Sequence, residues 1–147
     1  METGWLLPDL EHEVGAEFWH GCGRGELLVQ ACAACGKWRM PPRPMCPACR
    51  STEIRWDVTS GRGRIWSYVV PHPPLLPAYA DVAPYNAIIV ELEEDPMIRF
   101  AGNLVTSVDG AINEIDPATI QIGEPVRVVF TQIEEVSLPR WVRASQS

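Results

Sequence analysis

The chain has 147 residues, the size of one ordinary domain or of two very small domains that share a core. Its 12 Lys and Arg residues against 19 Asp and Glu residues give a formal net charge of −7. So acidic a surface repels phosphate backbones and argues against nucleic acid and anionic membranes as general partners. Hydrophobic residues make up 46% of the chain and charged residues 21%, a globular rather than a disordered balance.

The sequence predicts a protein without a secretory signal or a membrane span. Residues 1–3 lack a basic start, and Asp9, Glu11 and Glu13 stand where a signal peptide needs an apolar core. The longest uncharged stretch, residues 65–80, is rich in proline and cannot form a membrane helix. We therefore expect a cytoplasmic protein.

The first predicted element is a helix that begins at Asp9, its N-cap, and ends in the glycine-rich segment 21–25. Apolar side chains fall on one face of this helix at helical spacing: Leu10, Val14, Phe18 and Trp19. A chain of this size has little core to cover such a stripe, so we expect these four residues to contact a partner protein. The alternative is that the helix folds back on the cysteine-containing segment that follows it.

Four cysteines form two pairs at CxxC spacing, Cys32 with Cys35 and Cys46 with Cys49, and ten residues separate the pairs. In a reducing compartment such pairs favour a metal over disulfides. Zinc prefers four thiolates in a tetrahedron, and a turn-rich loop of this length is long enough to return the second pair to the first. We therefore predict one structural zinc ion per chain, with a redox or unliganded pair of motifs as the alternative. Cys22 is expected to be a plain apolar residue.

The two CxxC pairs are followed by different residue types, a glycine in one case and an arginine in the other. Gly36 follows the first pair, where a residue of positive φ lets backbone N–H groups point at sulfur. Arg50 occupies the matching place after the second pair, and a left-handed Arg costs roughly 1–2 kcal/mol.

The rest of the chain is predicted to be mainly β, with an N-terminal helix and zinc ribbon in residues 1–58 and a β-barrel in residues 59–147. Gly61-Arg62-Gly63 is interpreted as the entry to a strand rather than as a phosphate-binding loop, and Asp116-Pro117 as the start of a short helical turn. Short strands with one helical turn before the penultimate strand favour a small barrel of OB type over a β-sandwich. The expected strands cover residues 25–30, 54–58, 65–70, 86–93, 97–105, 126–132 and 138–142.

No nucleophile is visibly paired with a base in the sequence. His72, in a proline-rich loop, is the histidine best placed to touch a ligand. The residues alone therefore predict a zinc ribbon joined to a small β-barrel, acting as a binding module.

Most of the chain also resembles a known family, the domain-of-unknown-function family thirty-five, in which a rubredoxin-like zinc ribbon precedes an acyl-CoA-associated OB-fold. Arg50 departs from the family pattern, where Gly is usual. The matching segments follow the family order: Phe18-Trp19 with Gly25-Glu26-Leu27, CAACGKWRMPPRPMCPAC (32–49), GRGRIWSYVV (61–70), PYNAIIVELEE (84–94), GNLV (102–105), IGEPVRVVF (122–130) and LPRW (138–141).

This resemblance implies a function that the spacing of residues does not. Family members are generally accessory partners of thiolase-like enzymes, including sterol carrier protein-type thiolases, and the partner holds the catalytic residues. We therefore expect a non-catalytic subunit of a hetero-oligomer, most similar to the retro-aldol lyases of steroid side-chain degradation, with an acyl-CoA acetyltransferase or thiolase complex as the alternative. The CoA thioester would be shared with the partner, and His72, Tyr85 and Asn103 are expected to line its channel.

A nucleic-acid-binding module is the rival from another class, because zinc ribbons and OB-folds both occur in such proteins. Binding of single strands needs stacking aromatics and a basic groove. The aromatic residues are present, but a net charge of −7 argues against the groove.

Overall fold

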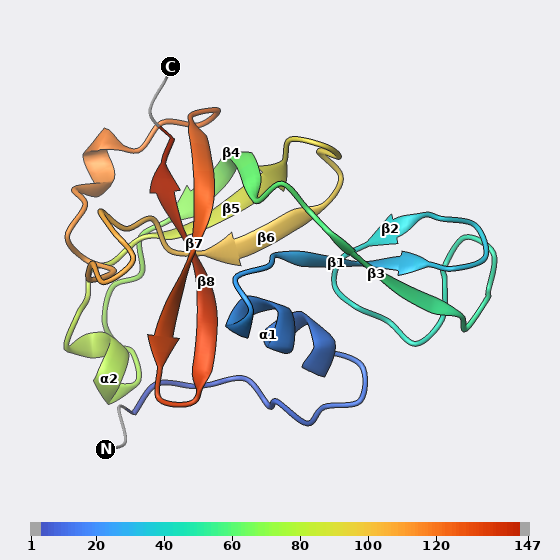
Figure 1. Ribbon diagram of the computed structural model, residues 1–147. Coiled ribbons are helices and arrows are strands. Elements are labelled where there is room, and N and C mark those ends of the chain that lie inside the picture. Colours follow the sequence, from blue (N-terminus) through green and yellow to red (C-terminus); the bar gives the residue numbers. More distant parts are fainter. Residues whose placement is uncertain (1–3, 145–147) are drawn as a thin grey trace.

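The structure is a computed structural model, and it describes residues 4–144 (Figure 1). Its regular secondary structure consists of two antiparallel sheets and three short helical segments. Figure 1 places a narrow ribbon of strands beside a curled sheet, with the longest helix at their junction. In chain order the elements are α1 (Ala16–Gly23), β1 (Leu28–Cys32), β2 (Trp38–Arg39), β3 (Ile54–Val58), β4 (Arg62–Val69), α2 (Pro77–Ala80), β5 (Ala87–Leu92), β6 (Arg99–Gly102), the 3-10 helix η1 (Pro117–Thr119), β7 (Pro125–Ile133) and β8 (Val136–Arg143).

The ribbon is a three-stranded sheet in the order β2-β1-β3. All five residues of β1 are buried, and β3 pairs with the whole of that strand, from Leu28 opposite Val58 to Cys32 opposite Ile54. The segment predicted as a strand at residues 54–58 is therefore confirmed as β3. β2 was not predicted, because two residues are too few to give a strand pattern.

The second sheet has the order β6-β5-β4-β7-β8 and closes into a barrel. Closure comes from a parallel bridge between Leu104 and Trp141, where the Trp141 amide donates to the Asn103 carbonyl oxygen at 3.0 Å. The Val105 amide in turn donates to the Trp141 carbonyl oxygen at 2.8 Å. With η1 between the third and fourth strands of the barrel, this is the OB-type topology that the sequence predicted, and the sandwich alternative is wrong.

Glycine allows two close approaches inside the barrel. A Cβ on Gly63 in β4 would lie 2.6 Å from Val90 Cγ1 and would also collide with the Glu91 carbonyl oxygen on β5. A Cβ on Gly102 would lie 2.9 Å from Trp141 Cδ1, beside the bridge that closes the barrel. Both sites need a residue without a side chain, because the neighbouring strand occupies the space.

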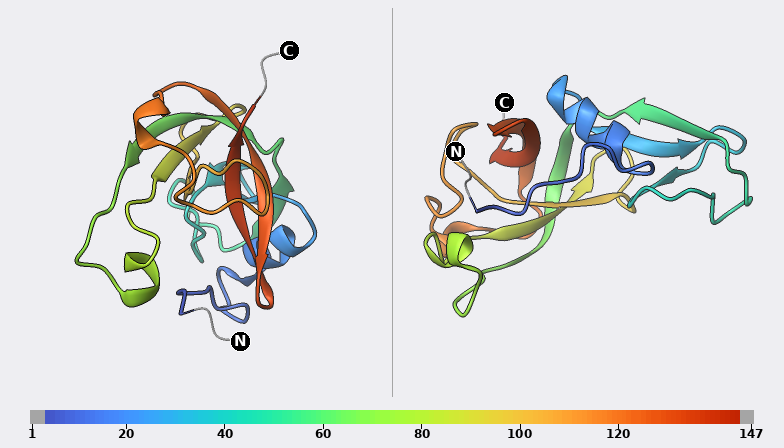
Figure 2. Two further views of the ribbon diagram at one scale, coloured as in Figure 1. Left: turned by 90° about the vertical axis from the view of Figure 1, so that its left-hand side faces the viewer. Right: turned by 90° about the horizontal axis from the view of Figure 1, so that it is seen from below.

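The N-terminal helix joins the ribbon to the barrel. One hydrophobic cluster contains Phe18 and Cys22 of α1, Val29 of β1 and the barrel residues Phe100 and Trp141. The rings of Phe18 and Phe100 stack with centroids 5.9 Å apart, and Figure 2 shows α1 lying between the two sheets. The expected division between residues 58 and 59 follows the end of β3, but the core crosses it.

The predicted start of the helix at Asp9 is wrong. α1 begins at Ala16, and Asp9 instead accepts the Glu11 amide at 2.9 Å in a local turn. Further along, Nδ1 of His12 accepts the amides of Val14 and Gly15, both at 3.2 Å. These side-chain acceptors offer the backbone an alternative to helical hydrogen bonds, which helical periodicity does not reveal.

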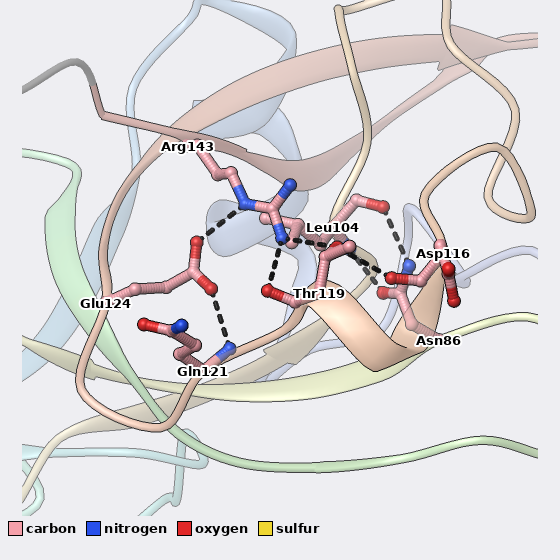
Figure 3. A network of polar contacts seen from close by, with 7 residues as sticks. All are labelled: Asn86, Leu104, Asp116, Thr119, Gln121, Glu124 and Arg143. Atoms are coloured by element: carbon pink, nitrogen blue, oxygen red, sulfur yellow. Dashed lines mark hydrogen bonds and ion pairs between the residues drawn. The ribbon is translucent and has the colours of Figure 1, made fainter.

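A polar network fixes one end of the barrel (Figure 3). Arg143 Nε lies 2.7 Å from Glu124 Oε1, and Arg143 Nη2 donates to the Thr119 carbonyl oxygen at 3.0 Å. Asp116 is the N-cap of η1, and its side chain accepts the Ala118 amide at 3.0 Å, which confirms the predicted helical turn. Within residues 4–144 no helix has the length and apolar character needed to cross a membrane.

We expect Gly63→Ala to lower the free energy of unfolding by about 1–3 kcal/mol, because the new methyl group must displace β5. Gly23→Ala is the matched control, since a Cβ there meets nothing within 4 Å. Chemical denaturation of both variants measures the difference. Equal stability of the two variants would contradict the close approach at Gly63.

Candidate metal centre

The four sulfur atoms of the predicted site come together at the outer end of the ribbon. Cys32, Cys35, Cys46 and Cys49 place their Sγ atoms within 4.8 Å of one another. The Cys32–Cys49 sulfur distance is 3.5 Å and the Cys35–Cys46 distance is 3.8 Å. Zinc–sulfur bonds of about 2.3 Å give tetrahedral edges of about 3.8 Å, which is close to these two sulfur separations, so the donor set fits one zinc ion.

The two CxxC turns have the same backbone pattern. The Gly36 amide donates to the Cys32 carbonyl oxygen at 2.8 Å, and the Arg50 amide donates to the Cys46 carbonyl oxygen at 2.9 Å. Gly36 has φ of 78° and Arg50 has φ of 66°, so Arg50 takes the same left-handed conformation as the glycine of the first turn. The second turn therefore holds an L residue where glycine is the unstrained choice.

The surroundings favour thiolates over thiols at the first cysteine of each pair. A hydrogen bond from the Cys35 amide, with N···Sγ of 3.4 Å, lowers the pKa of Cys32 to about 6. A backbone hydrogen bond from Cys49 likewise lowers the pKa of Cys46. Burial instead raises the pKa of Cys22 to about 12, which suits an inert apolar residue in the core.

A buried polar contact positions the loop that returns the second pair to the first. Gln30 on β1 accepts the Arg39 Nε–H at 2.6 Å and the Arg43 amide at 2.7 Å through the same side-chain oxygen. Arg39 also donates through Nη2 to the Arg43 carbonyl oxygen at 3.0 Å. The loop between β2 and Cys46 is thus tied to β1, whose last residue is Cys32.

The predicted channel residues lie in different environments. Asn103 is half-buried, and its side-chain amide donates to the Asn86 carbonyl oxygen at 2.5 Å, which ties the end of β6 to the start of β5. Tyr85 is half-buried against the small cluster of Val105, Ile112 and Val142. His72 is exposed in the loop before α2. Their role as channel residues stays a prediction.

The four residues of the predicted interface stripe also differ in their exposure to solvent. Phe18 is only 4% exposed and belongs to the core, so the expectation that it is uncovered is wrong. The reason is its stacking on Phe100 of the barrel, a long-range contact that the helical spacing could not show. Leu10, Val14 and Trp19 are half-buried, and for these three the interface stays a prediction.

Two features of the structure were missed. Asn86 is fully buried, donates to the Leu104 carbonyl oxygen at 2.9 Å and accepts the Leu104 amide at 2.6 Å (Figure 3). A lone Asn at the start of an apolar strand is the only signal for it. Arg62 and Arg127 lie directly opposite each other on β4 and β7, a pairing that no local pattern reveals.

The geometry defines the class of protein, a four-cysteine zinc ribbon followed by an OB barrel. Comparison with family models then identifies the family within that class. The model of the ChsH2 rubredoxin-like zinc ribbon domain matches residues 19–55. The model of the ChsH2 C-terminal OB-fold domain matches residues 56–131. The chain therefore belongs to the ChsH2 family, whose relatives carry the DUF35 name, and has the zinc ribbon that the sequence predicted.

Relatives of two kinds are similar to the chain. It is 38% identical over 126 residues to the 3-oxo-4,17-pregnadiene-20-carboxyl-CoA hydratase alpha subunit of Mycobacterium tuberculosis, covering 86% of this chain and 36% of that protein. It is 39% identical over 116 residues to a DUF35 domain-containing scaffold protein of Methanothermobacter thermautotrophicus, covering 76% of this chain and 77% of that protein. The chain thus spans about a third of the hydratase subunit and most of the scaffold protein.

A solved structure, that of an Ltp2-ChsH2(DUF35) aldolase, is similar to nearly the whole chain. The two chains superpose with a TM-score of 0.79 at 32% sequence identity. The match covers 94% of this chain and 100% of that chain.

We expect Cys46→Ser to release zinc and unfold the ribbon, because metal binding and folding are coupled at such sites. Cys22→Ala is the control: it also removes a thiol, yet it should keep one zinc per chain. Metal analysis with a thermal melt measures both. A Cys46→Ser variant with full zinc and an unchanged melt would refute the site.

The two turns allow a reciprocal test of the left-handed positions. A Cβ on Gly36 meets nothing within 4 Å, so Gly36→Ala should lower stability by about 1–2 kcal/mol through conformation alone. Arg50→Gly should be neutral or gain up to about 1 kcal/mol. The measurement is chemical denaturation of the zinc-loaded protein. A loss of stability in Arg50→Gly would show that the Arg side chain stabilises the turn.

Proposed function

We propose that this chain is a non-catalytic accessory subunit of a thiolase-like acyl-CoA enzyme, and that the complex is a retro-aldol lyase of steroid or lipid side-chain degradation. The observation that carries the proposal is the match to the whole ChsH2(DUF35) chain of an aldolase structure, at a TM-score of 0.79 and 32% identity. In this proposal the partner supplies the catalytic residues and shares a CoA thioester with this chain.

The similarity to a hydratase alpha subunit supports a place in CoA-thioester chemistry of steroids. That relative is named for a pregnadiene-carboxyl-CoA substrate, and the chain covers 36% of its length. The chain therefore corresponds to one part of that larger subunit. The shared part supports a common docking role rather than a common reaction.

The scaffold relatives favour one alternative, an accessory subunit of an acyl-CoA acetyltransferase or thiolase. The chain covers 77% of the Methanothermobacter scaffold protein at 39% identity, so an assembly role without the aldolase reaction fits as well. The reaction that the captured partner catalyses distinguishes an aldolase complex from an acetyltransferase or thiolase complex.

We place the partner interface on the N-terminal segment and the exposed side of α1. Leu10, Val14 and Trp19 are half-buried apolar side chains there. Trp19 packs edge-on against the buried Phe18 with ring centroids 4.9 Å apart, so it is held in place before any partner arrives. Preorganised Trp side chains are frequent binding hot spots.

The test begins with affinity purification of the tagged chain from its native cell and identification of the protein that elutes with it. A thiolase-like enzyme is the expected partner, and the reconstituted pair should cleave or condense CoA thioesters faster than the partner alone. The isolated chain should show no turnover. Robust turnover by the isolated chain, or a partner outside acyl-CoA chemistry, would contradict the proposal.

Trp19→Ala should weaken partner binding by about 2 kcal/mol with zinc retained and little change in the thermal melt. Met97→Ala, on an exposed side chain of the β5–β6 turn, is the control and should bind normally. Phe18→Ala should instead lower stability by about 3–5 kcal/mol, because it opens a cavity in the core. Titration calorimetry with the purified partner reports the affinities, and unchanged binding of Trp19→Ala would exclude this interface.

A further inference from the structure

Two arginines lie side by side on neighbouring strands of the barrel, in a chain whose net charge is −7. Arg62 on β4 is the direct cross-strand partner of Arg127 on β7, and both residues are exposed. Like charges directly opposite on a sheet are destabilising. Within residues 4–144 neither guanidinium has a carboxylate within the 4.0 Å of an ion pair, so no direct ion pair offsets the repulsion.

A third arginine extends this pair. Residues of β4 alternate between exposed and buried from Arg62 to Ile65, so Arg64 emerges on the same outer face as Arg62. Its Nη1 donates to the Gly123 carbonyl oxygen at 3.2 Å, which holds the guanidinium at the rim of the barrel. Arg64 lies opposite Pro125 on β7, two residues before Arg127 along that strand.

These arginines line a hollow rather than a flat surface. A cavity of about 340 Å³ is bounded by Arg62, Gly63, Arg64, Glu93, Pro125, Val126, Arg127 and Ala144. Its lining carries three guanidinium groups and the single carboxylate of Glu93, a formal charge of +2 (3 − 1). The volume lies in the range of small-ligand sites, roughly 300–1,000 Å³.

We propose that Arg62, Arg64 and Arg127 form an anion site that binds the phosphate groups of a small ligand. Guanidinium groups bind phosphate oxygens in bidentate geometry, and a bound dianion would turn the repulsion between Arg62 and Arg127 into attraction. The binding groups are side chains of the sheet. The segment Gly61-Arg62-Gly63 serves as the strand entry that the sequence predicted, not as a glycine-rich phosphate loop.

The chemistry of the neighbouring surface indicates what else the ligand carries. A second cavity, of about 600 Å³, shares Arg127 with the first and is lined by Val105, Val108, Ile115, Val129 and Val142, along with Thr106, Ser107 and Arg143. A ligand whose phosphate groups lie at the arginines of the first cavity and whose apolar portion lies in the second cavity fits both. A nucleic acid strand would need a continuous basic groove. Three clustered arginines in a chain with a net charge of −7 do not provide one.

The test uses the zinc-loaded chain alone, without any partner enzyme, so its outcome does not depend on the proposed function. Inorganic pyrophosphate is titrated at low ionic strength and followed by amide NMR shifts and calorimetry. We expect saturable binding with shifts centred on Gly63 and Val126. Arg127→Gln and Arg62→Gln should each weaken it about tenfold or more, the loss of one or two charge-assisted hydrogen bonds.

Arg43→Gln is the matched control, because Arg43 is exposed on the ribbon and the substitution changes the net charge equally. It should leave pyrophosphate affinity unchanged. An equal loss in Arg43→Gln, or no saturable binding in the unaltered chain, would overturn the proposal. Zinc content and a thermal melt establish that each variant is folded.

Two further ligands distinguish the sources of phosphate. Coenzyme A binding that the arginine variants weaken, with pantetheine failing to bind, would assign the site to a nucleotide phosphate. Equal affinity for pyrophosphate and coenzyme A would support the same site with free phosphates as ligands. A single-stranded oligonucleotide that binds at these arginines more tightly than either would overturn the small-ligand assignment.

Discussion

The aromatic row of Phe18, Phe100 and Trp141 holds the two halves of the molecule together. Phe18 comes from α1, Phe100 from β6 and Trp141 from β8, and Phe100 lies 5.9 Å from Phe18 and 6.5 Å from Trp141 between ring centroids. Trp141 is fully buried, and its backbone makes the bridge that closes the barrel. The same ring therefore stabilises the closure and, through Phe100, the docking of the helix. Aromatic rings bury large apolar areas, so this row supplies much of the core that so small a chain can form.

Much of this architecture follows from local sequence. Runs of apolar residues between turn signals predicted segments that overlap seven of the observed strands, and in strands such as β4 and β5 the buried residues alternate along the chain as a one-sided strand requires. The zinc ribbon followed from local sequence, since two CxxC pairs joined by a turn-rich loop of ten residues can bring four sulfurs to one ion. Asp116-Pro117 predicted η1 because an acceptor side chain next to a fixed φ is a local property.

The errors arise where a distant contact or a competing turn decides the outcome. The helix begins at Ala16 rather than Asp9 because Asp9 and His12 accept nearby amides. Phe18 is buried because a strand much later in the chain supplies Phe100. The facing arginines of β4 and β7 depend on strand register, which no single segment contains. The resemblance to a family supplied the acyl-CoA role that we propose, which neither spacing nor composition could give.

The strand β1 links the metal to the core. It has five residues, all buried, with Cys32 at one end and Val29 within the shared cluster near the other. At about 3.3 Å per residue it is roughly 16 Å long, and one end supplies a metal ligand while the other is buried in apolar packing. Pairing with β3 and burial along its whole length therefore constrain the backbone of β1 between the metal site and the core. A second protein that touches both ribbon and barrel meets a preset angle, and its second contact forms at the high effective concentration of a rigid bivalent ligand.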